Sequence, residues 1–157
     1  MINNHYINLL KFLATGFGSG YAKKAPGTAG TLACGVLLYA SLILFGQPSL
    51  LIKILLAFLV FIVGYLSLKT LSDAGEFSSD QDPGYIVIDE FAGLIVTMCF
   101  TEWNALTILL GFCLFRFFDI LKPFPIKQID NKKGPIWVML DDVLAGIIAG
   151  VIVLFIY

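Results

Sequence analysis

The stretch LLIKILLAFLVFIVGYLSLKTL, residues 50–71, decides the fold class, because only Lys53 and Lys69 interrupt it with charge. A run of about 20 apolar residues is what a helix needs to cross the hydrocarbon core of a bilayer. The whole chain has the same character: 59% of its 157 residues are hydrophobic and 13% are charged, against roughly 45–50% and about 25% in soluble domains. We therefore expect residues 1–157 to form one integral membrane domain.

Other apolar runs lie on both sides of this stretch. At the N-terminus, apolar side chains from Ile2 to Leu13 recur at helical spacing beside asparagines. This pattern predicts a short amphipathic helix that either lies on the membrane surface or packs against another helix. The expected fold is an all-α membrane bundle of about four to five hydrophobic helices plus this amphipathic helix. The further apolar runs are 32–45, 86–100, 105–118 and 140–157.

The basic residues indicate how such a bundle is oriented. If five hydrophobic helices alternate in direction, Lys53 falls on one side and every other lysine and arginine falls on the opposite side. By the positive-inside rule, the side with the basic residues faces the cytoplasm. The formal net charge is -1, which gives no reason to expect a nucleic-acid partner.

Some common kinds of site are not predicted. Cys34, Cys99 and Cys113 lie in apolar runs without a CxxC pair, so we interpret them as small hydrophobic residues rather than zinc ligands. The glycine-rich loop at residues 16–30 fits neither of the common nucleotide-binding patterns. Pro26 is expected to begin the first long helix, with Thr28 as its cap.

The stretch GYIVIDEFAGLIV, residues 84–96, places Asp89 and Glu90 in an apolar run. In the simplest interpretation Asp89 caps a helix and Glu90 lies in its first turn, where the helix dipole favours an anion by about 0.3–1 kcal/mol. A carboxylate deep in a membrane costs about 2.5–3.5 kcal/mol on insertion scales, more than the dipole offsets. The depth of the pair therefore decides between a structural and a functional role.

Two later stretches also carry charge. In FRFFDILKPFP, residues 115–125, Arg116 and Asp119 share a helix face, either as an ion pair or as a phosphate contact and a metal ligand, with Lys122 as a second phosphate contact. In VMLDDVLAGIIAG, residues 138–150, Asp141 and Asp142 point about 100° apart. Asp142 shares a stripe with two glycines and is expected to face the bundle, with Asp141 at its rim, although capping explains this pair equally well.

The alternating topology brings these acidic residues to one side of the membrane, together with Arg116 and Lys122. Clustered carboxylates without histidine or thiolate partners suit a hard cation such as Mg²⁺. Such an ion lowers the pKa of bound water and holds phosphoryl oxygens. The cluster therefore favours metal-assisted chemistry on a phosphate.

Together these motifs resemble the phosphatidylglycerophosphatase A family. The matching segments are APGTAGT (25–31), DPGYIVIDEFAG (82–93), FRFFDILKPFPI (115–126) and VMLDDVLAGI (138–147), supported by TGFGSG (15–20). Many members have Trp where this chain has Ala29, and GGxG where it has GPIW at 134–137. The resemblance implies a helical enzyme of the bacterial cytoplasmic membrane, with its active site facing the cytoplasm.

The resemblance also implies a reaction, which is the Mg²⁺-dependent hydrolysis of the terminal phosphate of phosphatidylglycerophosphate to phosphatidylglycerol and inorganic phosphate. Arg116 and Lys122 are implied as phosphate contacts, and Asp82 and Asp130 match further acidic positions. Two alternatives are a small transporter or channel, in which acids are spread through the membrane depth, and a structural subunit that packs through its glycine stripe. The implied catalytic residues are Asp89, Glu90, Asp119, Asp141 and Asp142; the implied metal ligands among them are Asp89, Glu90, Asp119 and Asp142.

Overall fold

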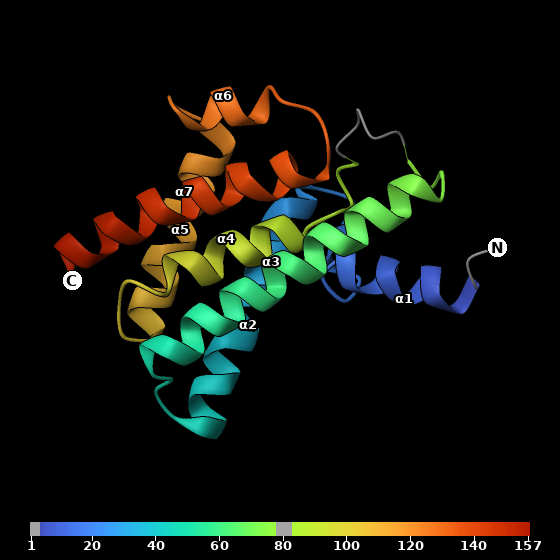
Figure 1. Cartoon of the computed structure of the whole chain (residues 1–157). Coiled ribbons are helices and arrows are strands. Elements are labelled where there is room, and N and C mark those ends of the chain that lie inside the picture. The colour runs from blue at the N-terminus through green and yellow to red at the C-terminus, as the bar shows by residue number, and fades with distance from the viewer. Residues whose placement is uncertain (1–3, 78–82) are drawn as a thin grey trace.

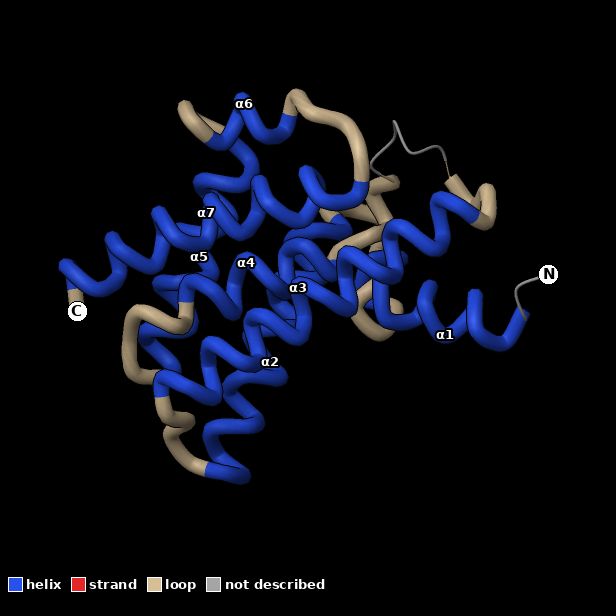
Figure 2. Tube along the Cα trace, viewed as in Figure 1, coloured by secondary structure: helices blue, strands red, loops and turns tan. Residues whose placement is uncertain are grey.

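Residues 4–77 and 83–157 are described by a computed structural model, shown in Figures 1 and 2. Across these residues the chain is helical and has no strand, which confirms the predicted all-α class. A short 3-10 turn, Ser19–Tyr21, lies between the first two helices. The helices are α1 (Asn4–Ala14), α2 (Pro26–Phe45), α3 (Leu50–Asp73), α4 (Ile88–Thr97), α5 (Ala105–Leu121), α6 (Ile126–Asp130) and α7 (Pro135–Ile156).

Three of these helices, α2, α3 and α7, are long and apolar enough to cross a membrane. The expected number of four to five is thus slightly wrong among the described residues, because α4 has 10 residues and α5 has 17. Apolar composition alone did not show that α4 begins only at Ile88 and stops at Thr97. The chain is nevertheless a membrane protein, since it exposes large apolar side chains along α2, α3, α5 and α7, a surface that suits hydrocarbon.

Two long helices begin at proline, which for α2 is the predicted start and for α7 is earlier than the apolar run 140–157 suggested. α2 begins at Pro26 and α7 at Pro135, because the fixed φ of proline suits the first helical position, where the missing N–H has no helical partner. The predicted cap at Thr28 is wrong: Ala25 precedes the first turn of α2, and Thr28 lies inside that turn.

α4 lies at the centre of the bundle and is packed by α2, α3, α5 and α7 (Figure 1). Gly93 of α4 and Gly146 of α7 bring their two helices into close contact, since a Cβ at Gly146 would overlap the Gly93 carbonyl. The Thr97 hydroxyl bonds across this contact to the Gly146 carbonyl at 3.1 Å. The predicted role of the small residues on α7 in helix packing is therefore observed.

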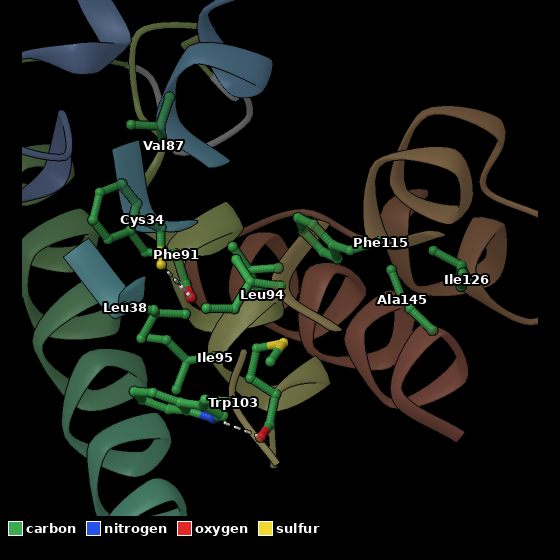
Figure 3. Close-up of a cluster of buried hydrophobic side chains, with 13 residues drawn as sticks. Cys34, Leu38, Val87, Phe91, Leu94, Ile95, Trp103, Phe115, Ile126 and Ala145 are labelled. Atoms are coloured by element: carbon green, nitrogen blue, oxygen red, sulfur yellow. Dashed lines mark hydrogen bonds between the residues drawn. The ribbon is translucent and has the colours of Figure 1, made fainter. Parts of the chain in front are cut away.

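Apolar side chains from four helices meet around α4. Figure 3 shows Leu94 of α4 near Phe115 of α5, and Cys34 of α2 near Phe91. The Cys34 thiol donates to the Phe91 carbonyl oxygen at 3.8 Å, and all three cysteines are free thiols. This agrees with the interpretation of Cys34 as a small buried hydrophobic residue.

Contacts between loops confirm that the helices alternate in direction. The α2–α3 turn meets the α4–α5 loop where Gln47 bonds the Trp103 backbone, and the Lys53 ammonium donates to the Thr101 carbonyl. Asn104 donates to the Tyr157 hydroxyl at 3.1 Å, so the end of α7 lies there as well. We call this side of the bundle, formed by residues 46–53, 98–104 and 157, the far end.

The predicted N-terminal helix is present as α1, at the opposite end. Ile7 and Leu10 are buried in a cluster with Leu68 and Leu71 of α3. Of the two alternatives for this helix, packing against another helix is therefore the one observed. Its other face still exposes large apolar side chains, at Tyr6, Leu9 and Phe12.

Candidate active site

Asp89 and Glu90 lie in the first turn of α4, at the end of the bundle away from the far end. Val87, not Asp89, precedes this turn, and no side-chain cap is present there. The interpretation of Asp89 as a cap is therefore wrong. Both carboxylates still benefit from the positive end of the helix dipole. Asp89 is 6% exposed and the Glu90 side chain 13%, which is far more burial than an ordinary helix start requires.

Asp142 joins this pair from the first half of α7. One carboxylate oxygen from each of Asp89, Glu90 and Asp142 lies within 4.8 Å of the others. Asp142 is only 3% exposed, as expected for a residue that faces the bundle. Burial first, and then the negative charge of Asp142, raise the pKa of Glu90 to about 8. We call Asp89, Glu90 and Asp142 the acidic triad.

Arg116 of α5 lies beside the acidic triad. Its Nη1 donates to Glu90 Oε1 at 3.5 Å and also to Asp119 Oδ2, one turn along the same helix. The predicted ion pair between Arg116 and Asp119 is thus present. Asp119 also contacts the Asp142 side chain, so it lies at the edge of the triad. The buried Nε of Arg116 has no hydrogen-bond partner among the described residues.

Gly27, in the first turn of α2, closes the other side of this arrangement. A Cβ at Gly27 would overlap Glu90 Oε1 and would lie 3.1 Å from both Nη atoms of Arg116. The backbone of α2 therefore packs directly against the charged groups. Sequence reasoning did not single out Gly27 as a site residue; its place directly after the helix-starting Pro26, in the APGT motif, was the available signal.

Lys122 and Asp141 form a neighbouring group of their own. The Lys122 Nζ donates to Asp141 Oδ2 at 2.6 Å and to Asp130. Burial disfavours the charged form of Lys122, but these hydrogen bonds outweigh it and raise the pKa of the ammonium. Asp141 is 5% exposed, so its carboxylate is buried beside Lys122 and is not open to water. The divergence of Asp141 and Asp142 is as predicted, because they contact different partners.

The acidic triad fits a hard divalent cation. Asp89, Glu90, Asp119 and Asp142 bring four carboxyl groups together against the single guanidinium of Arg116. Oε2 of Glu90 is buried and has no hydrogen-bond partner within the described residues. An oxygen-only donor set of this kind suits Mg²⁺ or a similar ion. Asp119 is the one predicted ligand outside the triad.

Three positions that differ from the resembled motifs, Pro135, Trp137 and Ala29, lie in the first halves of α7 and α2. Pro135 and Trp137, which replace glycines of the resembled motif, form the first turn of α7, and the Lys132 ammonium lies 3.9 Å from the centre of the Trp137 ring. Ala29 lies in the first half of α2, where it is half-buried. Asp82 lies outside the described residues.

A family model described as phosphatidylglycerophosphatase A matches residues 12–157. The chain belongs to the phosphatidylglycerophosphatase A family. Two bacterial proteins named phosphatidylglycerophosphatase A are similar to it. That of Haemophilus influenzae is 45% identical over 94% of this chain and 88% of its own length. That of Escherichia coli is 37% identical over 92% of this chain and 81% of its own length.

A third relative carries a different name. A protein of Bacteroides thetaiotaomicron, named putative phosphatidylinositol-3-phosphatase, is 34% identical over 90% of this chain and 89% of its own length. No solved structure gives a significant match. The predicted resemblance to the family and the prediction that the chain is an enzyme, a phosphatase, are thereby confirmed.

Proposed function

We propose that this chain hydrolyses the terminal phosphate monoester of phosphatidylglycerophosphate to give phosphatidylglycerol and inorganic phosphate, with Mg²⁺ as cofactor. The observation that carries the proposal is the convergence of Asp89, Glu90 and Asp142 beside Arg116. The family and the names of two relatives support this substrate. The basic residues near this end support a site on the cytoplasmic face of the bacterial inner membrane.

In this proposal the acidic triad holds the ion, which when bound polarises phosphoryl oxygens and lowers the pKa of water. Arg116 orients the phosphate, because a planar guanidinium matches phosphate oxygens. Its partners Glu90 and Asp119 hold the guanidinium in place, so little conformational freedom is lost when substrate binds.

Lys122 is the second phosphate contact in this proposal, after Arg116. Two of its three N–H groups donate to Asp130 and Asp141, which leaves the third to donate to a phosphate oxygen. Asp141 thus acts through Lys122, as a positioning residue for the ammonium. The charge that develops on the phosphate is balanced by Arg116 and Lys122 together.

The transporter alternative is not favoured by this arrangement. An ion pathway needs polar groups through the depth of the membrane. The acidic triad instead gathers at one end of α4, whose remaining buried residues are apolar or small apart from Thr97.

Phosphate release from purified protein in detergent tests the proposal. We expect release from phosphatidylglycerophosphate with Mg²⁺, loss of release with a chelator, and a fall of about 100-fold or more in kcat/KM for Glu90→Gln and Asp142→Asn. Glu102→Gln, at the far end, is the control and should retain activity. Full activity in both triad variants would overturn the residue assignment, and the absence of metal-dependent release would overturn the reaction.

The headgroup is tested in the same assay. The name of the Bacteroides relative makes phosphatidylinositol 3-phosphate the appropriate competing substrate. We expect a higher kcat/KM for phosphatidylglycerophosphate. A higher value for the inositol lipid would preserve the lipid-phosphatase chemistry but replace the proposed substrate.

A further inference from the structure

An apolar groove of about 300 Å³ runs between α2 and α3, with α4 as its floor. α2 and α3 follow one another in sequence, yet in the described part of the chain each packs mainly against α4 rather than against the other. The space between them is lined by apolar side chains, among them Leu37 of α2, Leu59 and Val63 of α3, and Phe91 and Ile95 of α4.

The groove opens toward the lipid. Leu37 and Leu59, on its two sides, are both about half exposed, and both belong to helices long enough to cross a membrane. The hydroxyl of Ser41, which also lines the groove, already donates to the Leu38 carbonyl at 2.8 Å. The groove therefore offers water almost no hydrogen-bonding partner, and an alkyl chain is the occupant that this chemistry favours.

The groove and the acidic triad lie one after the other along α4. Asp89 and Glu90 occupy the first turn of α4, and Phe91 and Ile95 follow them toward the far end. α2 has the same order: Gly27 contacts Glu90, and Leu37 lines the groove further along. The charged groups thus lie near the start of α4 and the apolar groove lies further along it toward the far end, the same order as headgroup and acyl chain in a lipid.

Gly16 shapes the end of the groove nearest the triad. Its φ of 54° lies in the left-handed region, and a Cβ there would meet Phe91 Cε2 at 2.6 Å and the Val87 side chain at 2.8 Å. The glycine therefore lets the loop after α1 pack closely over this end of α4. At about 1.5 Å per residue, the groove then follows α4 from Ile88 to Ile95 for roughly 10 Å.

We propose that the groove between α2 and α3 binds one acyl chain of the lipid phosphate substrate while its headgroup lies at the acidic triad. This inference rests on the proposed function, because it assigns the lipid end of the same substrate. It makes the groove a determinant of chain-length preference, separate from the groups that act on the phosphate.

Leu59→Trp tests the proposal by filling the groove from its exposed side. Leu55→Trp is the matched control, because Leu55 lies one turn away on α3, is exposed to the same 57%, and does not line the groove. The kcat/KM of each variant is measured for dioleoyl and dihexanoyl phosphatidylglycerophosphate in mixed micelles at a fixed surface fraction of substrate. Circular dichroism establishes that both variants are folded.

We expect Leu59→Trp to lower kcat/KM for the dioleoyl lipid about tenfold, as when about two methylene groups lose their buried contacts. The value for the dihexanoyl lipid should stay within twofold of the unmodified chain, and Leu55→Trp should change neither. Equal values for the two variants, or an equal fall on both lipids, would overturn the groove assignment. If the unmodified chain released no phosphate from either lipid, the proposed function itself would fail.

Discussion

Gly27→Ala is a sensitive test of the site, because the three atoms nearest to the added methyl group belong to Glu90 and Arg116. The new Cβ would overlap Glu90 Oε1 and lie 3.1 Å from both Arg116 Nη atoms, where ordinary contacts are 3.4–4 Å. Relief of the overlap requires the Glu90 carboxylate to move by about 1 Å. A displacement of this size in a preorganised site costs on the order of 100-fold in rate.

The same substitution should not unfold the protein. Gly27 lies in a helix, where alanine is intrinsically favoured over glycine by up to about 1 kcal/mol. We therefore expect a thermal midpoint in detergent close to that of the unmodified chain, together with a loss of phosphate release of about 100-fold. The two measurements separate an effect on the site from an effect on the fold.

Gly35→Ala is the control on the same helix. Its Cβ would make ordinary contacts, at 3.5 Å to Ile108 and 3.8 Å to Leu94, so both stability and activity should be retained. If Gly27→Ala keeps its activity within twofold of the Gly35→Ala value, Glu90 and Arg116 are not held against α2 in the way described, and the reasoning is refuted.

Two further substitutions probe the fold around the site. Lys122→Met leaves the buried Asp141 carboxylate without its cation, so we expect a loss of about 1–3 kcal/mol in unfolding free energy; thermal unfolding in detergent measures it, and the double variant with Asp141→Asn should recover part of the loss. Gly146→Ala places a methyl group on the Gly93 carbonyl and should cost about 1–3 kcal/mol. An unchanged midpoint in Lys122→Met or Gly146→Ala would contradict the corresponding contact.

The sequence predicted where the site lies better than it predicted which charged residues of the site pair with one another. Alternating helix directions were enough to bring Asp89, Glu90 and Asp142 to one end, because that prediction needs only the order of the apolar runs. The partner of Lys122 was not predictable in this way. Lys122 has a φ of 43° and lies just after α5, and its ammonium bonds to Asp130 and Asp141.

The lengths of the helices were also not predicted correctly from the sequence, for a related reason. The apolar run at 86–100 is long enough for most of a membrane crossing, but α4 uses only residues Ile88–Thr97 of it. Its hydrophobicity reflects enclosure by four neighbouring helices rather than contact with lipid. Composition cannot separate these two environments, because both exclude water from the side chains.

The position at which α4 begins also bears on the path that we expect for the proposed substrate's headgroup. Ile88 contacts Gly64 of α3, and Lys69 is the first charged residue of α3 beyond that point. At 1.5 Å per residue along α3, Gly64 lies roughly 7 Å from Lys69. The start of α4, beside Gly64, is therefore more than one helical turn inside the apolar part of α3. For the proposed substrate we therefore expect the phosphate to move inward from the level of Lys69, with the headgroup linker folding back toward the chains. We expect headgroups that are too stiff for this bend to be poorer substrates.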